Sequence, residues 1–288
     1  MKKNILITGA NSYVGTNVEK WLMKEPDKYH VETLDMKDPN WKAFDFSKFD
    51  VVFHVAGIAH VSKKKSLEEL YYKVNRDLTI ETAQKAKDSG VKQFIFMSSM
   101  IVYNSKETVI TKNTKPNPDN FYGQSKLDAE NGLLKLESQE FKVSVLRPPM
   151  IYGPGSKGNF PKLVKLVKKA FIFPNIQNKR SMLYIDNLSK MIEGTISNNL
   201  SGILFPQNPD IQSTTQITRF IRQIHGKRTL FTKLLNPFIY LTRNRVSVVN
   251  KLFSDSYYES TMSIELKDYC TIDMASSLKA MFEKRDKK

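Results

Sequence analysis

The sequence is poor in the residues that build cross-links and metal sites. Its 288 residues include one cysteine and four histidines. The lone Cys270 excludes an internal disulfide and suits a reducing compartment. No Cys or His cluster has the spacing of metal ligands, so we expect no metal site and assign the histidines to structural or surface positions. These are the scattered residues His30, His54, His60 and His225.

Long hydrophobic runs are missing as well. No apolar run reaches the roughly 18 residues that a membrane-spanning helix needs. The first nine residues carry the positive charge of a signal peptide, but their apolar stretch is short and leads straight into a glycine turn. We therefore expect a cytoplasmic protein.

Acidic residues are absent from two stretches, 141–185 and 211–254, in a chain whose formal charge is +16. In the second stretch, basic residues alternate with apolar ones. Such a segment can lie on an anionic membrane surface, so a peripheral membrane contact is one interpretation. A core-packed helix pair is the interpretation that we favour. No nucleic-acid-binding motif accompanies the charge, and we expect no nucleic-acid partner.

The most informative pattern is Tyr122-Gly-Gln-Ser-Lys126, with Ser99 upstream. A tyrosine and a lysine four residues apart share one face of a helix. A free phenol titrates near about 10, and a neighbouring ammonium group lowers that pKa. The Ser99 hydroxyl can hydrogen-bond the oxygen on which the proton is exchanged. This trio predicts proton transfer at a carbinol or ketone, with the hydride carried by a cofactor.

The start of the chain predicts where that cofactor binds. Residues 4–8 read as a buried strand, and Gly9-Ala-Asn-Ser-Tyr-Val-Gly15 leads from it into a helix. Backbone N–H groups at a helix N-terminus favour a pyrophosphate. A second strand ends at Asp35, and a carboxylate there suits the free ribose 2′-OH of NAD. We predict NAD binding, without excluding NADP.

Strands alternate with helical stretches as far as about residue 150, which is typical of a doubly wound parallel sheet. The length allows one large α/β unit and a smaller lobe. We therefore predict two domains, residues 1–150 and 151–288. Some segments of the second, about 180–208, are expected to return to the first domain.

Several further segments carry a family resemblance. They are Thr8–Gly15, Val51–Gly57, Asn75 in its helix, Phe94–Tyr103 with Ser99 inside it, the Tyr122 and Lys126 pair, Arg147–Pro154, and Arg180–Asp186. On these segments the chain resembles the extended short-chain dehydrogenase/reductase superfamily and, within it, the NAD-dependent epimerase/dehydratase family acting on nucleotide sugars. The second half is most similar to bacterial polysaccharide-locus members.

The resemblance implies a Rossmann-type α/β domain, a mixed α/β substrate lobe, and a homodimer formed through helices at about 66–89 and 121–139. It implies a catalytic trio of Ser99, Tyr122 and Lys126. The implied cofactor-binding residues are Thr8, Gly9, Asn11, Ser12, Tyr13, Val14, Gly15, Asp35, Asp45, Phe46, Val55, Ala56, Gly57, Asn75, Lys126 and Pro148. The implied substrate-binding residues are Ser99, Met100, Tyr122, Pro149, Met150, Asn159, Phe160 and Arg180.

The resemblance also assigns roles. Tyr122 would protonate the nascent alkoxide and Ser99 would polarise the carbonyl. Lys126 would bind the nicotinamide ribose and hold the tyrosine pKa down. Arg180 would contact the UDP diphosphate, and the acid-free stretch 141–185 would attract that anionic substrate.

Departures from the family pattern narrow the reaction. Related dehydratases carry an Asp-Glu pair where this chain has Met100 and Ile101, and neither of these side chains can exchange protons. We predict a 4-ketoreductase that acts on a UDP-2-acetamido-2,6-dideoxy-4-hexulose to give UDP-N-acetylfucosamine or UDP-N-acetylquinovosamine for surface polysaccharide. The alternative is a UDP-hexose 4-epimerase, of UDP-glucose or UDP-GlcNAc type, that retains its NAD. A non-catalytic dinucleotide-binding protein is a third possibility.

Overall fold

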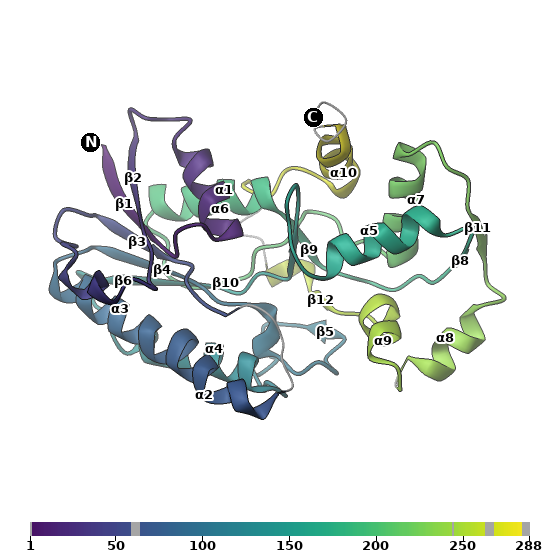
Figure 1. The fold of residues 1–288 in the computed structure, drawn as a ribbon, viewed down its shortest axis with the longest axis horizontal. Helices are drawn as coiled ribbons and strands as arrows, with labels where there is room; N and C mark the ends of the chain where they lie inside the picture. Colours follow the sequence, from purple (N-terminus) through teal and green to yellow (C-terminus); the bar gives the residue numbers. More distant parts are fainter. Residues whose placement is uncertain (1, 59–63, 244, 263–267, 284–288) are drawn as a thin grey trace. The chain divides into compact units, whose positions relative to one another are not determined.

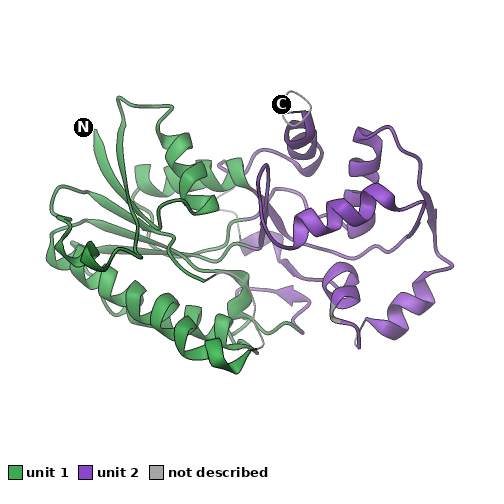
Figure 2. Ribbon diagram, in the orientation of Figure 1, with its two compact units in different colours: residues 1–105, 114–148, 185–206 green, residues 106–113, 149–184, 207–288 purple. Residues whose placement is uncertain are grey.

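The computed structural model describes residues 2–58, 64–243, 245–262 and 268–283. The chain divides into two compact units (Figure 2). Unit 1 comprises residues 1–105, 114–148 and 185–206, and unit 2 comprises residues 106–113, 149–184 and 207–288. Among the described helices, none has the length and apolar character needed to cross a bilayer.

Unit 1 is built on a six-stranded sheet in which every neighbouring pair is parallel (Figure 1). Its strands are β1 (Lys3–Thr8), β2 (Tyr29–Leu34), β3 (Val51–His54), β4 (Gln93–Met97), β6 (Lys142–Leu146) and β10 (Gly202–Leu204). Their order is β10-β6-β4-β3-β1-β2. The chain winds outward from β1 in both directions, which confirms the predicted doubly wound, Rossmann-type α/β fold.

Helices cover both faces of this sheet, α1 and α6 on one and α3 and α4 on the other (Figure 1). The α-helices of unit 1 are α1 (Tyr13–Leu22), α2 (Glu68–Tyr71), α3 (Leu78–Asp88), α4 (Phe121–Leu134) and α6 (Ile185–Ser197). Because both faces are covered, the central strands are apolar runs, and β3 and β4 are buried at every position.

Short helical turns complete unit 1. They are the 3-10 helices η1 (Pro39–Ala43), η2 (Lys65–Leu67) and η4 (Met100–Val102), and the π-helix η3 (Tyr72–Asp77). The helix predicted over 66–89 is therefore divided by η3, and the helix predicted over 121–139 ends at Leu134.

Parallel strands bring their carboxyl ends to one edge of a sheet, where α/β proteins bind their ligands. The segments that follow β1, β3 and β4 at this edge are 9–12, 55–58 and 98–99. Asp35 follows β2, and Pro148 follows β6. The topology thus gathers most of the predicted cofactor residues at a single edge.

Unit 2 contains three short parallel strand pairs, β7–β9, β8–β11 and β5–β12, in its described residues. Its strands are β5 (Val109–Ile110), β7 (Met150–Tyr152), β8 (Ile172–Pro174), β9 (Met182–Tyr184), β11 (Leu230–Thr232) and β12 (Tyr257–Tyr258). Its helices are α5 (Asn159–Lys169), α7 (Thr214–Ile224), α8 (Asn236–Thr242), α9 (Ser247–Phe253) and α10 (Met274–Glu283). Fully buried aromatic rings form its centre, with Tyr152 lying 4.8 Å from Phe160 and 5.6 Å from Tyr184 between ring centroids.

His54, at the end of β3, is completely buried. Its Nδ1 lies 2.7 Å from the Thr8 hydroxyl, and its Nε2 lies 3.1 Å from the Thr79 hydroxyl. Burial and, to a smaller extent, the charge of Lys126 together lower the pKa of His54 to about 3. The neutral imidazole is therefore a structural link between β1, β3 and α3.

This link predicts a pH dependence of stability. The unfolded chain binds a proton at this imidazole below its ordinary pKa of about 6.5, whereas the folded chain does not until about pH 3. The stability contribution is thus complete above about pH 6.5 and is lost as the pH falls. Between pH 7 and pH 5, we expect the unfolding free energy of the wild type to drop by about 2 kcal/mol more than that of His54→Gln. Urea unfolding at both pH values measures this difference, and equal losses would contradict the prediction.

Candidate active site

Helix α4 presents both Tyr122 and Lys126, and it begins at a defined cap. The Asn120 side chain accepts a hydrogen bond from the Gly123 N–H at 2.9 Å. A Cβ added at Gly123 would lie 2.4 Å from the Ile101 carbonyl oxygen, so only glycine lets the first turn of α4 approach η4 this closely. Ser99 caps η4 and accepts a hydrogen bond from the Ile101 N–H at 3.2 Å. The glycine between Tyr122 and Lys126 therefore brings the tyrosine up to Ser99.

Tyr122 is buried beside Ser99. Burial, with a smaller contribution from the neighbouring Tyr71, raises the pKa of Tyr122 to about 12, although hydrogen bonding to Ser99 lowers it. The Tyr71 ring centroid lies 5.9 Å from that of Tyr122. At neutral pH the phenol is therefore protonated. The shift runs opposite to the one predicted from Lys126, because burial outweighs the hydrogen bond in this arrangement.

Lys126 is buried too, and its ammonium group reaches the ends of β3 and β4. Its Nζ donates to the Met97 carbonyl oxygen at 2.9 Å and lies 4.6 Å from the ring centroid of Phe96. A Cβ added at Gly57 would lie 3.2 Å from the same Nζ. Burial lowers the pKa of Lys126 to about 8, and the Glu130 carboxylate raises it. The lysine can therefore exchange a proton near neutral pH.

Asn75 lies in the π-helix η3 and hydrogen-bonds both to the segment after β3 and to α4. It is fully buried. Its Oδ1 accepts a hydrogen bond from the Ile58 N–H at 2.8 Å, and its Nδ2 donates to the Ile58 carbonyl and to Ser125 Oγ, each at 3.2 Å. The asparagine thus fixes the segment after β3 to α4, beside Lys126. A π-helical turn often marks a functional position.

The glycine turn after β1 packs closely against the segment that follows β3. Gly9 has a φ of +110°, and a Cβ there would lie 2.7 Å from the Ala56 nitrogen. A Cβ at Gly15 would lie 3.2 Å from a methyl carbon of Val55. Ser12 caps α1 and accepts a hydrogen bond from the Gly15 N–H at 3.0 Å. A glycine turn that lets strand and helix pack closely at a helix N-terminus is the kind of place where a dinucleotide's pyrophosphate binds, so these residues fit a dinucleotide.

Other predicted cofactor residues flank this turn. Asn11 adopts a left-handed φ of 62°, and Tyr13 and Val14 open α1. The Leu34 carbonyl oxygen, one residue before Asp35, accepts hydrogen bonds from the backbone of Gly9 and Ala10 at 2.9 and 3.1 Å. The Asp35 carboxylate is exposed beside the turn and accepts a hydrogen bond from the Lys37 N–H at 3.0 Å.

Of the neighbouring predicted cofactor residues Asp45 and Phe46, the first is exposed to solvent and the second is buried in the core. The side chain of Asp45 is exposed, and hydrogen bonds from the hydroxyl and N–H of Ser47 hold its pKa below the ordinary value. Phe46 has no exposed surface and belongs to the core under the sheet. If Phe46 contacts a nucleotide, its backbone makes that contact.

A buried ion pair behind the trio was not predicted from the sequence. Arg147, which follows β6, donates from Nε to both carboxylate oxygens of Glu130 on α4, at 3.1 and 3.2 Å. The Ser98 hydroxyl donates to the same carboxylate, and an Arg147 N–H donates to the Tyr103 hydroxyl at 2.7 Å. One feature of the sequence could have indicated that Glu130 lies near the trio: it follows Lys126 by one helical turn.

The remaining predicted substrate residues, other than Ser99, Met100 and Tyr122, belong to unit 2. Pro149 is buried and directly precedes β7, whose first residue, Met150, pairs with Met182. Asn159 opens α5 and is exposed, whereas Phe160 is buried against Tyr152. The guanidinium of Arg180 donates to the Ser254 carbonyl oxygen at 3.1 Å. All of these contacts lie within unit 2.

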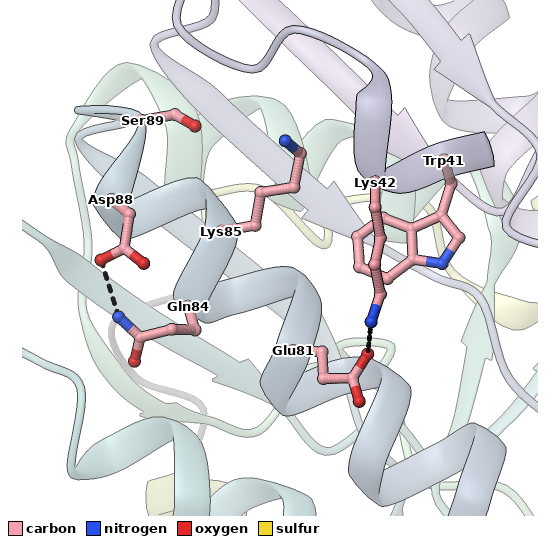
Figure 3. Close-up of a pocket in the computed structure, with 7 residues that line it drawn as sticks. All are labelled: Trp41, Lys42, Glu81, Gln84, Lys85, Asp88 and Ser89. Carbon is pink, nitrogen blue, oxygen red and sulfur yellow. Dashed lines mark hydrogen bonds and ion pairs between the residues drawn. The ribbon is translucent and has the colours of Figure 1, made fainter.

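Figure 3 shows a cavity of about 440 Å³ on unit 1, outside the predicted site. Its side chains largely pair with one another: Lys42 forms an ion pair with Glu81 at 2.9 Å, and Gln84 donates to Asp88 at 2.8 Å. We assign it no ligand. The lining residues are Trp41, Lys42, Glu81, Gln84, Lys85, Asp88 and Ser89.

Comparisons with known proteins agree with the geometry. Residues 5–202 match the NAD dependent epimerase/dehydratase family. A UDP-glucose 4-epimerase of Vibrio cholerae is 38% identical in an alignment of 219 positions that covers 67% of this chain and 66% of that protein, just under two thirds of its length. An N-acetyl-alpha-D-glucosaminyl-diphospho-ditrans,octacis-undecaprenol 4-epimerase of Escherichia coli O157:H7 is 27% identical, over 94% of this chain and 86% of that protein. The crystal structure of a UDP-glucuronic acid 4-epimerase from Bacillus cereus with NAD has the same fold, with a TM-score of 0.75 and 19% identity over 99% of both chains.

Proposed function

We propose that this chain, which belongs to the NAD dependent epimerase/dehydratase family, is an NAD-dependent 4-epimerase of a UDP-sugar. One observation carries the proposal: Tyr122 is buried beside Ser99, whose hydroxyl lowers the phenol pKa, and the buried Lys126 lies one helical turn away on the same helix. This arrangement suits proton exchange on the hydroxyl oxygen of a sugar carbon that is oxidised and reduced in turn. Two relatives named as 4-epimerases support that choice over the reductase predicted from the sequence.

The chain's own residues would exchange the proton, and NAD, held by the glycine turn after β1, would supply the hydride acceptor and donor. Tyr122 is protonated at neutral pH, so it is ready to donate a proton to the oxygen at C4 when the ketone is reduced. When the C4 hydroxyl is oxidised, the same phenol must accept a proton. The positive charge of Lys126 on the same helix face would favour the phenolate at that stage. Ser99 can hydrogen-bond the substrate oxygen throughout.

A second candidate is the predicted 4-ketoreductase acting on a UDP-2-acetamido-2,6-dideoxy-4-hexulose. One feature of the site favours it: a phenol with a pKa of about 12 is protonated at neutral pH, so it already holds the proton that reduction consumes but must lose that proton before it can accept one. Reduction of the ketone requires only that the Tyr122 phenol donate a proton. The homodimer implied by the family resemblance also stays a prediction.

The experiment starts from the protein as purified. Bound nucleotide is released by heat and identified, and the intact protein is incubated with UDP-glucose and UDP-GlcNAc without added cofactor. We expect tightly retained NAD⁺ and interconversion of C4 epimers, with no net change in NADH absorbance. A separate assay supplies NADH and a UDP-4-keto-6-deoxy-HexNAc. Stoichiometric NADH oxidation, without interconversion in the first assay, would overturn the epimerase and establish the reductase.

A further inference from the structure

Unit 2 exposes large apolar side chains on β8, β11 and α8 and in the segments beside them. We call this set the apolar edge, and it consists of Phe171, Ile172, Leu230, Leu234, Phe238 and Leu241. Their exposed fractions are 83%, 56%, 64%, 87%, 65% and 68%. Folded chains rarely gather exposed apolar groups of this size unless the surface binds something.

These side chains come from segments that contact one another. Ile172 and Leu230 are register partners on the paired strands β8 and β11, and the Leu230 N–H donates to the Phe171 carbonyl at 2.8 Å. Asn236 at the start of α8 donates to the Asn175 carbonyl oxygen at 2.9 Å, which ties the helix to the segment after β8. Figures 1 and 2 show β8, β11 and α8 along one border of unit 2.

The core-packed helix pair that we favoured for residues 211–254 is observed only in part: α7 buries Ile217 and Ile221, whereas α8 does not pack into the core. The seven residues of α8, Asn-Pro-Phe-Ile-Tyr-Leu-Thr, are mostly apolar, yet none of them is buried. Phe238 and Leu241 are three residues apart and share a helix face. An apolar helix that the fold does not bury is available to an external partner.

Basic side chains surround the apolar edge, and acidic ones are scarce there. Residues 211–254 contain eight basic residues and no acidic residue, and the preceding stretch 141–185 is also free of acid. Lys169, Lys233 and Arg245 are exposed, and the Arg243 guanidinium lies 5.2 Å from the ring centroid of Tyr240. Asp255, the next acid along the chain, accepts a hydrogen bond from the Lys179 N–H at 2.8 Å. Residue 244 lies outside the described part of this stretch.

We propose that the apolar edge and its basic surroundings dock unit 2 onto an anionic lipid bilayer surface. Leucine and phenylalanine side chains enter the boundary between headgroups and acyl chains, while lysine and arginine attract anionic headgroups. A second copy of the chain fits less well, because a symmetric contact would set this cationic surface against itself. Nucleic acid would use the cations but would leave the leucines in water. The docking does not depend on which of the two reactions the enzyme catalyses.

Vesicle co-sedimentation of the full chain tests the proposal. The vesicles are phosphatidylcholine alone or phosphatidylcholine mixed with phosphatidylglycerol, at about 0.05 M and about 1 M salt. We expect binding to the mixed vesicles at low salt, and at least about tenfold weaker binding at high salt or without phosphatidylglycerol. Two double variants, Phe238→Ser with Leu241→Ser and Lys233→Glu with Arg245→Glu, should each weaken binding about tenfold.

Controls separate docking from misfolding and from self-association. Met23 is 60% exposed on unit 1, so Met23→Ser removes a matched apolar side chain from another surface and should bind like the wild type. Circular dichroism and turnover of a water-soluble nucleotide sugar should be unchanged in both double variants. Absence of binding to mixed vesicles at low salt would overturn the proposal, and so would binding that the serine variant leaves intact. If sedimentation velocity shows that the serine variant splits an oligomer while the wild type ignores vesicles, the apolar edge is a subunit interface and the proposal fails.

Discussion

Replacing Tyr122 with phenylalanine lowers kcat by a factor of about 10²–10⁴ and leaves the chain folded with its nucleotide bound. The ring keeps its packing against Tyr71, whose centroid lies 5.9 Å away, while the exchangeable proton is lost. Ser99 keeps its hydrogen bond from the Ile101 N–H, so η4 stays in place. Turnover of the UDP-sugar, followed by NMR, measures the change, and released NAD confirms that the cofactor site is intact.

Tyr29→Phe is the matched control for this result. It removes a phenol hydroxyl that lies 2.9 Å from Ser197 Oγ, between β2 and α6. We expect its turnover to stay within about twofold of the wild type, because this hydroxyl has no part in proton exchange. If Tyr122→Phe also kept most of its turnover while remaining folded and cofactor-bound, the assignment of Tyr122 as proton donor would be wrong for either reaction.

The sheet could be predicted because burial on both faces makes its central parallel strands apolar runs. Phe94-Ile-Phe-Met97, which is buried at every position, is an example. The turn after β1 could also be predicted, because only glycine fits at a position such as Gly9, where the backbone of Ala56 lies close. These features follow from local backbone and burial requirements, which the sequence records directly.

Features that depend on residues far apart in the sequence could not be predicted from it. The π-helix η3 interrupts the predicted helix at Asn75, whose side chain bonds to Ile58 on a different segment. The pKa of Tyr122 was predicted to fall, yet burial dominates it, and burial depends on the whole fold. The periodicity of α8 does not distinguish a buried helix from an exposed one, because an apolar residue can face either environment.

The buried ion pair between Glu130 and Arg147 explains how the fold holds the trio. Their side chains are 1% and 5% exposed. The carboxylate also accepts a hydrogen bond from Ser98, the neighbour of Ser99, and its charge raises the pKa of Lys126. One charged pair thus links α4, the end of β4 and the start of the segment after β6.

Arg147→Ala should lower the free energy of unfolding by about 3–5 kcal/mol, because it leaves the Glu130 carboxylate buried without a counter-ion. Urea unfolding at pH 7 measures this loss. The exposed pair of Lys42 and Glu81, with side chains 65% and 52% accessible, is the control, and we expect Lys42→Ala to cost less than about 1 kcal/mol. The double variant Glu130→Leu with Arg147→Met removes both charges together.

Because no uncompensated charge then stays buried, the double variant should lose less stability than Arg147→Ala alone. It should nevertheless lose turnover, since Ser98 and Lys126 no longer face a carboxylate. A pH profile of kcat supplies the readout specific to positioning. The charge of Glu130 raises the pKa of Lys126, so the limb that reports Lys126 should move to lower pH in the double variant. An unchanged profile, or a stability loss at least as large as that of Arg147→Ala, would mean that the pair does not act as a unit beside the active site.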